Sequence, residues 1–526
     1  MLRLAEVVFA LSIASDLGMG QPLEHGLRTT MVALRLAELT GLDRDSLREV
    51  YYVSLLHYVG CSAEAQEDAD FFGDEIAARP DLVGTLFGSR VEMARVGLRH
   101  LHPELPPHRR AVIAVRSAPL MLGEFRRWAQ GHCEVAQLIG DRFELGEGVR
   151  ASMGMLSERW DGKGFPGASG GDQLPLAVRF MQVAHDAEIS WRRKGVEGAR
   201  ELVGTRGGHG LDPDIARLFC EHAGTVLDGL EAPSLWDELL AAEPGLRAVI
   251  ASDERFEDCL TVIADFADMK TSQTAGHSRA VAALATDAAA AAGMADSEVA
   301  RVRHAALVHD VGRVAVSAGI WTKTGELSRD EQEKVRLAPY YTERILDRPE
   351  RLRELGQIAG MHHERCDGSG YHRGLHGEQI PAAARILAVA DTYCTLTEVG
   401  PRREALPPDR AAAAITDEVR AGRLDRDAAN AVLAAAGQPA AARSPAHPAG
   451  LTDRETQVLG LLARGLVTKQ IAWKLGISPK TADRHIQNLY GKIGISTRAG
   501  ATLFALQHNL LPSSDSYSPA AGTHSG

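Results

Sequence analysis

Aromatic residues are scarce in this sequence, and its cysteines form no recognisable pairs. Phe, Trp and Tyr together make up 5% of the 526 residues, and the abundance of alanine favours closely packed helices over β-sandwiches. The six cysteines are scattered without a Cys-x-x-Cys pair. This usage is typical of reduced thiols in a cytoplasmic protein rather than of a disulfide framework.

Long apolar runs are also absent. No stretch approaches the roughly 20 apolar residues that a membrane-spanning helix needs, so we expect no membrane contact. Residues 7–11 could imitate part of a signal peptide, but the acidic Glu6 and the lack of a basic cluster favour the first helix of a folded domain. An apolar content of 45% is ordinary for globular proteins, and the length predicts about three domains.

The C-terminal residues 451–511 allow the expected helix boundaries to be placed. Thr452 and Glu455 form a capping box at the start of a first helix, and Gly465 ends that helix. Thr468 is expected to cap a second helix. The segment contains eight Lys and Arg against three Asp and Glu, a net charge of +5, whereas the whole chain has −11. A basic module on an acidic body favours a contact with nucleic acid.

A third helix is expected over Pro479 to Ile493, with Ser478 as its N-cap. One of its faces is an apolar stripe and the other is polar and basic. Two short helices joined by a glycine turn, the second basic outside, are typical of a helix-turn-helix that binds double-stranded DNA. The polar face supplies the candidate DNA contacts, which are Lys480, Thr481, Asp483, Arg484, Gln487, Asn488 and Lys492.

This segment resembles the LuxR-type C-terminal DNA-binding domain along its whole length. The resemblance is carried by Leu451-Thr452-x-Arg454-Glu455, Lys469-x-Ile471-Ala472 and Leu475-Gly476-Ile477-Ser478-Pro479-Lys480-Thr481. It implies a fourth helix, from Arg498 to Gln507, and a third helix that enters the major groove. We expect a homodimer on a near-palindromic site. Candidates for the dimer contact on the fourth helix are Ala501, Leu503 and Ala505.

The first 440 residues contain an internal repeat. Two pairs of histidines have the same spacing of 32 residues: His25 with His57, and His277 with His309. Residues 158–185 also match residues 364–391 at a constant offset of 206. This agreement indicates two copies of one helical domain.

The second copy resembles the HD-GYP family of metal-dependent phosphodiesterases over residues 255–436. The matching motifs are Gly276-His277-Ser278, Ala306-Leu307-Val308-His309-Asp310-Val311-Gly312, His362-His363-Glu364-Arg365 and Ala388-Val389-Ala390-Asp391. The resemblance implies an all-helical fold. Hydrolysis of a phosphodiester needs a hydroxide and a group that holds the phosphoryl oxygens, and neighbouring divalent metal ions supply both.

The resemblance also implies the site residues of this copy. The expected ligands of divalent metal ions, Fe or Mn, are His277, His309, Asp310, His362, His363 and Asp391. The candidate catalytic residues are His309, Asp310 and Arg313, the last replacing a lysine that the family usually has.

Ala338 stands where the family has a further metal histidine, which leaves metal occupancy and catalytic activity open. Restoring an imidazole by Ala338→His is expected to raise both the metal occupancy and the turnover.

The first copy is more diverged. It keeps His25, His57 and His132, but Tyr58 replaces the aspartate of the His-Asp pair and His185 replaces the last aspartate. Three histidines without an anionic bridge make a poor hydrolytic site. We therefore expect relic histidines in a helical core, and bound metal in the second copy. A dimer surface or a ligand pocket is the alternative role for this copy.

Together these patterns predict an all-α cytoplasmic transcription regulator whose body senses or hydrolyses a phosphoester signal such as a cyclic dinucleotide. Two alternatives remain: a metal-dependent phosphodiesterase with an accessory DNA-binding module, and a catalytically inactive pseudo-enzyme that binds a ligand. The expected domains are a degenerate HD-GYP-like domain (1–240), an HD-GYP-like domain (241–436), a linker (437–449), a LuxR-type module (450–512) and a disordered tail (513–526).

Overall fold

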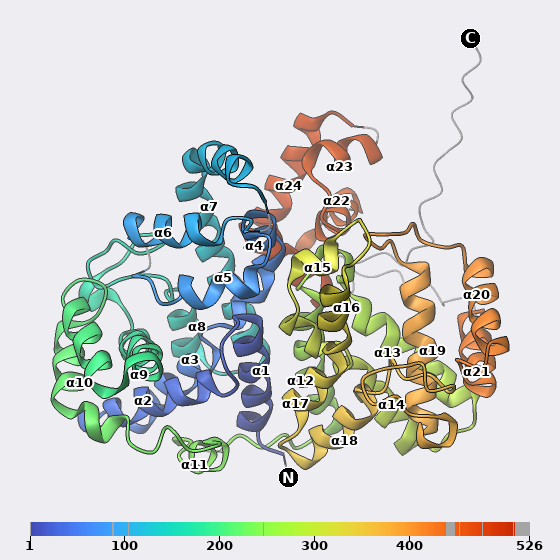
Figure 1. Cartoon of the computed structure of the whole chain (residues 1–526), viewed down its shortest axis with the longest axis horizontal. Helices are drawn as coiled ribbons and strands as arrows, with labels where there is room; N and C mark the ends of the chain where they lie inside the picture. Colours follow the sequence, from blue (N-terminus) through green and yellow to red (C-terminus); the bar gives the residue numbers. More distant parts are fainter. Residues whose placement is uncertain are drawn as a thin grey trace. The chain divides into compact units, whose positions relative to one another are not determined.

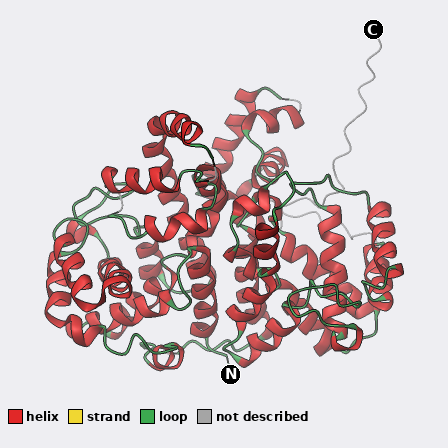
Figure 2. Ribbon diagram, viewed as in Figure 1, coloured by secondary structure: helices red, strands yellow, loops and turns green. Residues whose placement is uncertain are grey.

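The computed structural model shows an all-helical protein, as predicted (Figure 2). It describes residues 2–86, 89–103, 105–245, 247–437, 448–451, 453–475, 477–508 and 510. Within these ranges no β-strand occurs, and only isolated bridges are present. Among the described helices, none combines the length and apolar character needed to cross a membrane. All six cysteines are free thiols.

The chain divides into two compact units. The first consists of residues 1–271, 307–322 and 327–360, and the second of residues 272–306, 323–326 and 361–526, within the described ranges. The domain boundaries expected from the sequence stay predictions. Most of the expected linker and the whole C-terminal tail lie outside the described residues.

Figure 1 labels the helices from α1 to α24. Those of the first unit are α1 (Leu4–Gly18), α2 (His25–Leu39), α3 (Arg44–Leu56), α4 (Ala65–Phe72), α5 (Glu75–Leu82), α6 (Arg90–His100), α7 (Pro107–Arg142), α8 (Glu147–Met153), α9 (Leu176–Arg206), α10 (Pro213–Val226), α11 (Trp236–Ala241), α12 (Asp253–Asp268), α15 (Ala318–Thr322), α16 (Arg329–Arg336), α17 (Ala338–Leu346) and α18 (Glu350–Ala359). Those of the second unit are α13 (His277–Ala291), α19 (Ala382–Thr397), α20 (Pro408–Arg420), α21 (Arg426–Ala436), α22 (Asp453–Ala463), α23 (Thr468–Lys474), α24 (Pro479–Ile493) and α25 (Arg498–Gln507). The unit boundary falls inside α14 (Asp296–Val308).

Helix α1 forms part of the core of the first unit. Its residues Val7, Phe9 and Leu11 are fully buried, and the ring of Phe9 meets that of Trp236 edge-on at 4.8 Å. The apolar run at the N-terminus is therefore a core helix, as the sequence predicted. Nearby, α2, α3 and α9 pack against one another, and this three-helix arrangement determines where their polar side chains meet.

Two loops have the same hydrogen-bond pattern at the offset of 206 residues. In each, a glutamate before the loop accepts hydrogen bonds from loop N–H groups: Glu158 from Gly167 and Ala168, and Glu364 from Arg373 and Gly374. Two backbone bonds are also matched: Phe165 N to Ser157 O with Tyr371 N to His363 O, and Gly171 N to Trp160 O with Gly377 N to Cys366 O. The sequence repeat therefore corresponds to repeated local structure.

A second correspondence places His132 and Ala338 at matching positions. A Cβ added to Gly60 would lie 2.0 Å from the carbonyl oxygen of His132. A Cβ added to Gly312 would lie 2.0 Å from the carbonyl oxygen of Ala338. Both glycines thus permit the same close approach of two backbone segments.

A buried ion pair joins distant segments of the first unit. The carboxylate of Glu75 accepts from Lys270 Nζ at 2.8 Å, from the Ser317 hydroxyl at 2.6 Å and from the Ala318 N–H at 2.8 Å. Both charged side chains are almost completely buried. Burial would raise the pKa of Glu75, but Lys270 outweighs that effect and lowers the pKa below 4.5. The carboxylate is therefore charged at neutral pH.

We predict that Lys270→Met lowers the free energy of unfolding by roughly 3–5 kcal/mol, because it leaves a buried carboxylate without its cation. The double variant Lys270→Met with Glu75→Gln should lose less, since no charge is stranded. Urea unfolding followed by circular dichroism measures both. Equal losses in the single and double variants would contradict this account of the pair.

Candidate metal centres and nucleic-acid interface

In the second unit, His277 is held between two carboxylates at the start of α13. Gly276 before it has a left-handed backbone with φ of 84°, which sets the entry of the chain into the helix. His277 Nε2 lies 3.2 Å from Asp391 Oδ1, and Nδ1 lies 2.9 Å from Glu398 Oε2. Burial alone would lower the pKa of His277, but Glu398 and Asp391 raise it well above 6.5.

Asp391 on α19 also lies beside the two consecutive histidines. One ligand atom from each of His362, His363 and Asp391 can be chosen so that all lie within 4.8 Å of one another. The rings of His362 and His363 are 4.0 Å apart. The second unit therefore brings together four of the six expected metal ligands, in a donor set of imidazole and carboxylate that suits Fe or Mn.

The remaining two expected ligands, His309 and Asp310, lie in the first unit directly after α14. The side chain of Thr342 fixes this turn, because its hydroxyl donates to His309 O at 2.9 Å and accepts from Gly312 N at 3.0 Å. Asp310 Oδ2 lies 3.3 Å from a guanidinium nitrogen of Arg313. Thr342 and Glu398 carry no motif that could have identified them from the sequence.

Ala338 has an apolar environment. Its side chain is buried and packs in a cluster with Val316 and Ile320. Trp321, Leu327 and Val335 pack against this cluster. An imidazole at position 338 would have to displace these apolar side chains. Overpacking a close-packed cluster typically costs about 1–3 kcal/mol of folding free energy. We therefore expect Ala338→His to destabilise the protein rather than to raise its metal occupancy.

We predict that Ala338→His lowers the melting temperature of the protein and leaves its metal content unchanged. Differential scanning fluorimetry and elemental analysis of the purified variant check both parts. The volume control Ala338→Leu should destabilise comparably. A variant that gains metal at unchanged stability would show that position 338 accepts the missing ligand after all.

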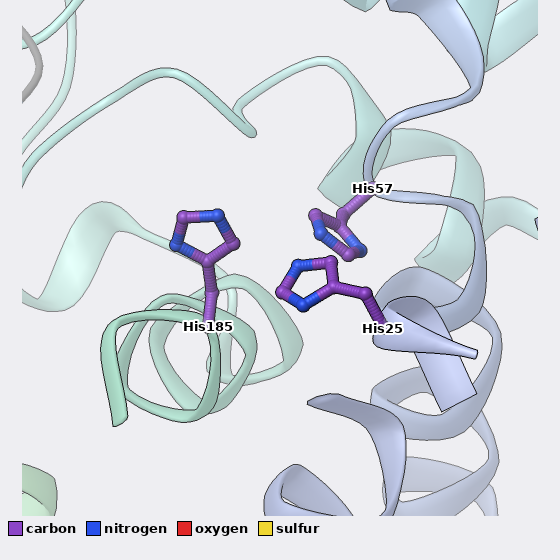
Figure 3. A group of neighbouring side chains, drawn as sticks. All are labelled: His25, His57 and His185. Atoms are coloured by element: carbon purple, nitrogen blue, oxygen red, sulfur yellow. The ribbon is translucent and has the colours of Figure 1, made fainter. Parts of the chain in front are cut away.

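The first unit contains a group of three histidines (Figure 3). One nitrogen from each of His25, His57 and His185 can be chosen so that all three lie within 4.8 Å of one another. His25 begins α2 after Glu24, whose φ of 65° is left-handed. The strain in this non-glycine residue is offset by its carboxylate, which accepts from the Ser234 hydroxyl at 2.7 Å and from the Leu235 N–H at 2.9 Å.

Each histidine in this group has a defined partner on one ring nitrogen. His25 Nδ1 lies 2.6 Å from Glu188 Oε2, and His57 Nδ1 lies 2.6 Å from the carbonyl oxygen of Ser54. His185 Nε2 lies 2.5 Å from the hydroxyl of Tyr58. Burial lowers the pKa of His25 despite Glu188, and lowers that of His57 much further.

Glu188 was not identified from the sequence, yet it organises this group. Besides facing His25, its carboxylate accepts from Arg28 Nε and from Arg192 Nε, both at 3.0 Å. Burial would raise the pKa of Glu188, but His25 and the two arginines lower it well below 4.5. The group thus combines two imidazoles of lowered pKa, His25 and His57, with a charged carboxylate behind His25.

A cavity of about 210 Å³ lies beside the three histidines in the first unit. Its polar lining includes His57, Tyr58, His132 and His185. Burial lowers the pKa of His132 to about 4, and its Nδ1 lies 3.0 Å from the Cys61 sulfur. His132 therefore belongs to the cavity wall and not to the three-histidine group.

The C-terminal helices follow the sequence prediction closely. α24 spans Pro479–Ile493, and the Ser478 hydroxyl caps it by accepting from Thr481 N at 3.1 Å. α25 spans Arg498–Gln507, as expected. All seven expected DNA-contact residues of α24 are exposed, whereas Ala482, Ile486 and Leu489 are buried.

Three details of this module differ from expectation or lie outside the description. α23 begins at Thr468 with Val467 as its N-cap, because the Gln470 side chain accepts from Val467 N at 3.0 Å; Thr468 is therefore not the cap. The expected cap Thr452 lies outside the described residues. Lys492 Nζ pairs with the buried Glu455 at 2.6 Å, so a phosphate contact by Lys492 stays a prediction that must compete with this ion pair.

The expected dimer contact on α25 is wrong. Ala501, Leu503 and Ala505 are all fully buried, in a helix that packs on α22. They belong to the core of the module, since small apolar residues at helical spacing serve a core as readily as an interface. The homodimer itself stays a prediction.

Comparison with known families matches two parts of the chain. Residues 261–428 match the HD domain, and residues 449–505 match the luxR family of bacterial regulatory proteins. The chain therefore contains an HD domain, followed by a C-terminal domain of the luxR family.

Individual relatives extend this finding. The chain is 27% identical to the 3'3'-cGAMP-specific phosphodiesterase 3 of Vibrio cholerae, over 79% of this chain and 91% of that protein. It is 33% identical to the cyclic di-GMP phosphodiesterase response regulator RpfG of Xanthomonas campestris, over 31% of this chain and 43% of that protein. A crystal structure of the V. cholerae cyclic GMP-AMP-specific phosphodiesterase V-cGAP3 shares the fold, with a TM-score of 0.58 and 24% identity, over 83% of this chain and 98% of that one.

For the DNA interface, we predict that Arg484→Ala lowers affinity for a specific site by roughly 1–3 kcal/mol and relaxes base preference at one position. Lys480→Ala is the control, because a phosphate contact should weaken all sequences alike and reduce the salt slope by about 1. Fluorescence anisotropy on selected and random duplexes separates the two. Equal losses on both duplexes for Arg484→Ala would show that Arg484 does not read a base.

Proposed function

We propose that this protein is a DNA-binding transcription regulator whose HD domain hydrolyses a cyclic dinucleotide. The observation that carries the proposal is the occurrence of both matched domains in one chain, with histidine and aspartate side chains converging where the HD motifs fall. The cyclic dinucleotide class comes from relatives whose names specify 3'3'-cGAMP or cyclic di-GMP.

The proposed metal ligands all fall inside the HD match: His277, His309, Asp310, His362, His363 and Asp391. Bound Fe or Mn would supply a hydroxide at neutral pH and would polarise the phosphoryl oxygens. Asp391 contributes a charged carboxylate beside His277 and His363. We assign to Arg313 a contact with a substrate phosphate; its guanidinium lies over the ring of Trp321 at 4.0 Å, which keeps it extended.

We also propose that residues 1–240 are a diverged copy of the same domain. The matched loops at an offset of 206 residues and the matched close approaches at Gly60 and Gly312 support this origin. Tyr58 and His185 replace the two aspartates of the pattern. We therefore assign the hydrolytic chemistry to the second copy alone.

A second candidate function is a pseudo-enzyme that binds the cyclic dinucleotide without hydrolysing it. The apolar packing of Ala338 favours it, because one expected ligand is replaced by a side chain that belongs to a core. A site with one ligand fewer binds its metal more weakly, and water then fills the vacant position.

Hydrolysis of 3'3'-cGAMP and of cyclic di-GMP by the full-length protein with added Mn or Fe tests the proposal. We predict turnover on the order of 1 s⁻¹ or more for at least one of them. Asp391→Asn should lower it by at least the ~10–100-fold that loss of an outer-shell partner costs. Asp409→Asn, an exposed residue of α20, is the matched control and should have no effect.

The outcomes separate the two candidates. Tight binding of either nucleotide without turnover would overturn hydrolysis and favour the pseudo-enzyme. Neither binding nor turnover would contradict both candidates. Turnover that is insensitive to Asp391→Asn would contradict the assigned site.

A further inference from the structure

Two buried imidazole nitrogens in the first unit have no role in the proposed function. Nε2 of His25 and Nε2 of His57 are buried and have no hydrogen-bond partner among the described residues. His25 is 0% exposed and His57 is 5% exposed. An unsatisfied buried polar atom typically costs about 1–3 kcal/mol, and native cores contain few of them. Two such atoms side by side indicate a missing ligand rather than relic core residues.

The hydrogen bonds of the two Nδ1 atoms determine which nitrogen of each ring carries the proton and which carries a lone pair. The carbonyl oxygen of Ser54 can only accept, so His57 Nδ1 carries the proton of their 2.6 Å bond. The same holds for His25 Nδ1 and the charged carboxylate of Glu188 at 2.6 Å. Each Nε2 therefore exposes a lone pair to the space between the rings. Metal-binding histidines almost always donate their other N–H to a carboxylate or a carbonyl in this way.

His185 completes the group from α9 on the opposite side (Figure 3). One of its nitrogens faces the Tyr58 hydroxyl at 2.5 Å and the other lies 3.4 Å from Asp186 Oδ1. A metal ion would take one nitrogen and leave the other with its present partner. The three ligands come from α2, from the residue that follows α3, and from α9, which pack against one another.

We propose that His25, His57 and His185 bind one divalent transition-metal ion of the zinc type. Three imidazole ligands, with their carboxylate partners on the opposite ring nitrogens of His25 and His185, suit Zn²⁺ and disfavour Mg²⁺ or Ca²⁺, which select oxygen ligands. His57 and His185 also line the 210 Å³ cavity, so a fourth coordination position faces that cavity. Three histidines with an open fourth position are a known arrangement of zinc sites.

The cavity chemistry favours a metal ion over a directly bound anionic ligand. Its three lining arginines already have carboxylate partners within this unit: Arg79 with Asp68, Arg159 with Asp161, and Arg206 with Asp186. Their charge is therefore compensated. The lone pairs without a partner among the described residues are on the histidines. A cation between these rings would bind the lone pairs and add a positive charge that the paired arginines do not supply.

Cobalt substitution of the full-length protein tests this site. The protein is stripped with a chelator and reloaded with Co²⁺, whose visible d–d absorption reports four-coordinate binding. We expect His57→Ala with His185→Ala to lose this absorption and one equivalent of metal. Asp391→Asn should retain this absorption and this equivalent of metal, because Asp391 belongs only to the site of the proposed function. His132→Ala, in the cavity wall, is the matched control and should also retain them.

Zinc K-edge absorption on the Asp391→Asn protein covers the case in which the double variant fails to fold. We expect a first shell of three imidazoles and one light ligand. A shell that contains sulfur, or one dominated by carboxylate oxygen, would overturn the proposal. So would a well-folded His57→Ala, His185→Ala variant that keeps the cobalt absorption and metal content of the wild type.

Discussion

Burial of ionisable side chains between packed helices is the constraint on which this structure depends. A buried imidazole or carboxylate must find a partner, because transfer from water without one costs several times the thermal energy. The first unit meets this requirement with Glu75 and Lys270, and with Glu188 and its arginines. Where partners are lacking among the described residues, at Nε2 of His25 and of His57, the ion that we propose would complete this requirement.

The two histidine groups therefore differ in chemistry although they occupy related places in a repeated pattern. In the second unit the imidazoles stand beside carboxylates, and Glu398 and Asp391 raise the pKa of His277. In the first unit the carboxylate of Glu188 stands behind His25, and burial lowers the pKa of His25 and of His57. If residues 1–240 are the diverged copy that we propose, Tyr58 and His185 at the positions of the two aspartates favour a zinc-type ion over Fe or Mn.

Local chemistry explains what could be predicted from the sequence. The bounds of α24 were right because its Ser-Pro start is decided within a few residues. Those of α25, which has no such start, agree with the resemblance to the LuxR-type domain. The cap of α23 was wrong because the decisive bond comes from the Gln470 side chain. The prediction of a dimer face on α25 was wrong because the spacing of apolar residues shows that a helix face is buried but not which surface buries it.

Partners that are distant in sequence and lie outside any motif could not be predicted. Glu188 meets His25 across 163 positions, and Lys270 meets Glu75 across 195. The side chain of Ala338, which stands where the resemblance implies a metal histidine, packs in an apolar cluster. The contacts of Glu188 with His25 and of Lys270 with Glu75 depend on how the helices cross, and no sequence motif encodes that.

The central proposal is a transcription regulator with a cyclic-dinucleotide domain, so binding of the nucleotide is expected to change the affinity for DNA, and one equilibrium measurement tests this most directly. The affinity of full-length Asp391→Asn protein, which is expected to consume the ligand at least ~10–100-fold more slowly than the wild type, is measured for a duplex selected from random DNA, with and without saturating cyclic dinucleotide. If the HD domain regulates the DNA-binding domain, the two dissociation constants differ, by about 5–150-fold for a typical coupling of 1–3 kcal/mol. Identical dissociation constants, with the nucleotide shown to be bound, would contradict the account.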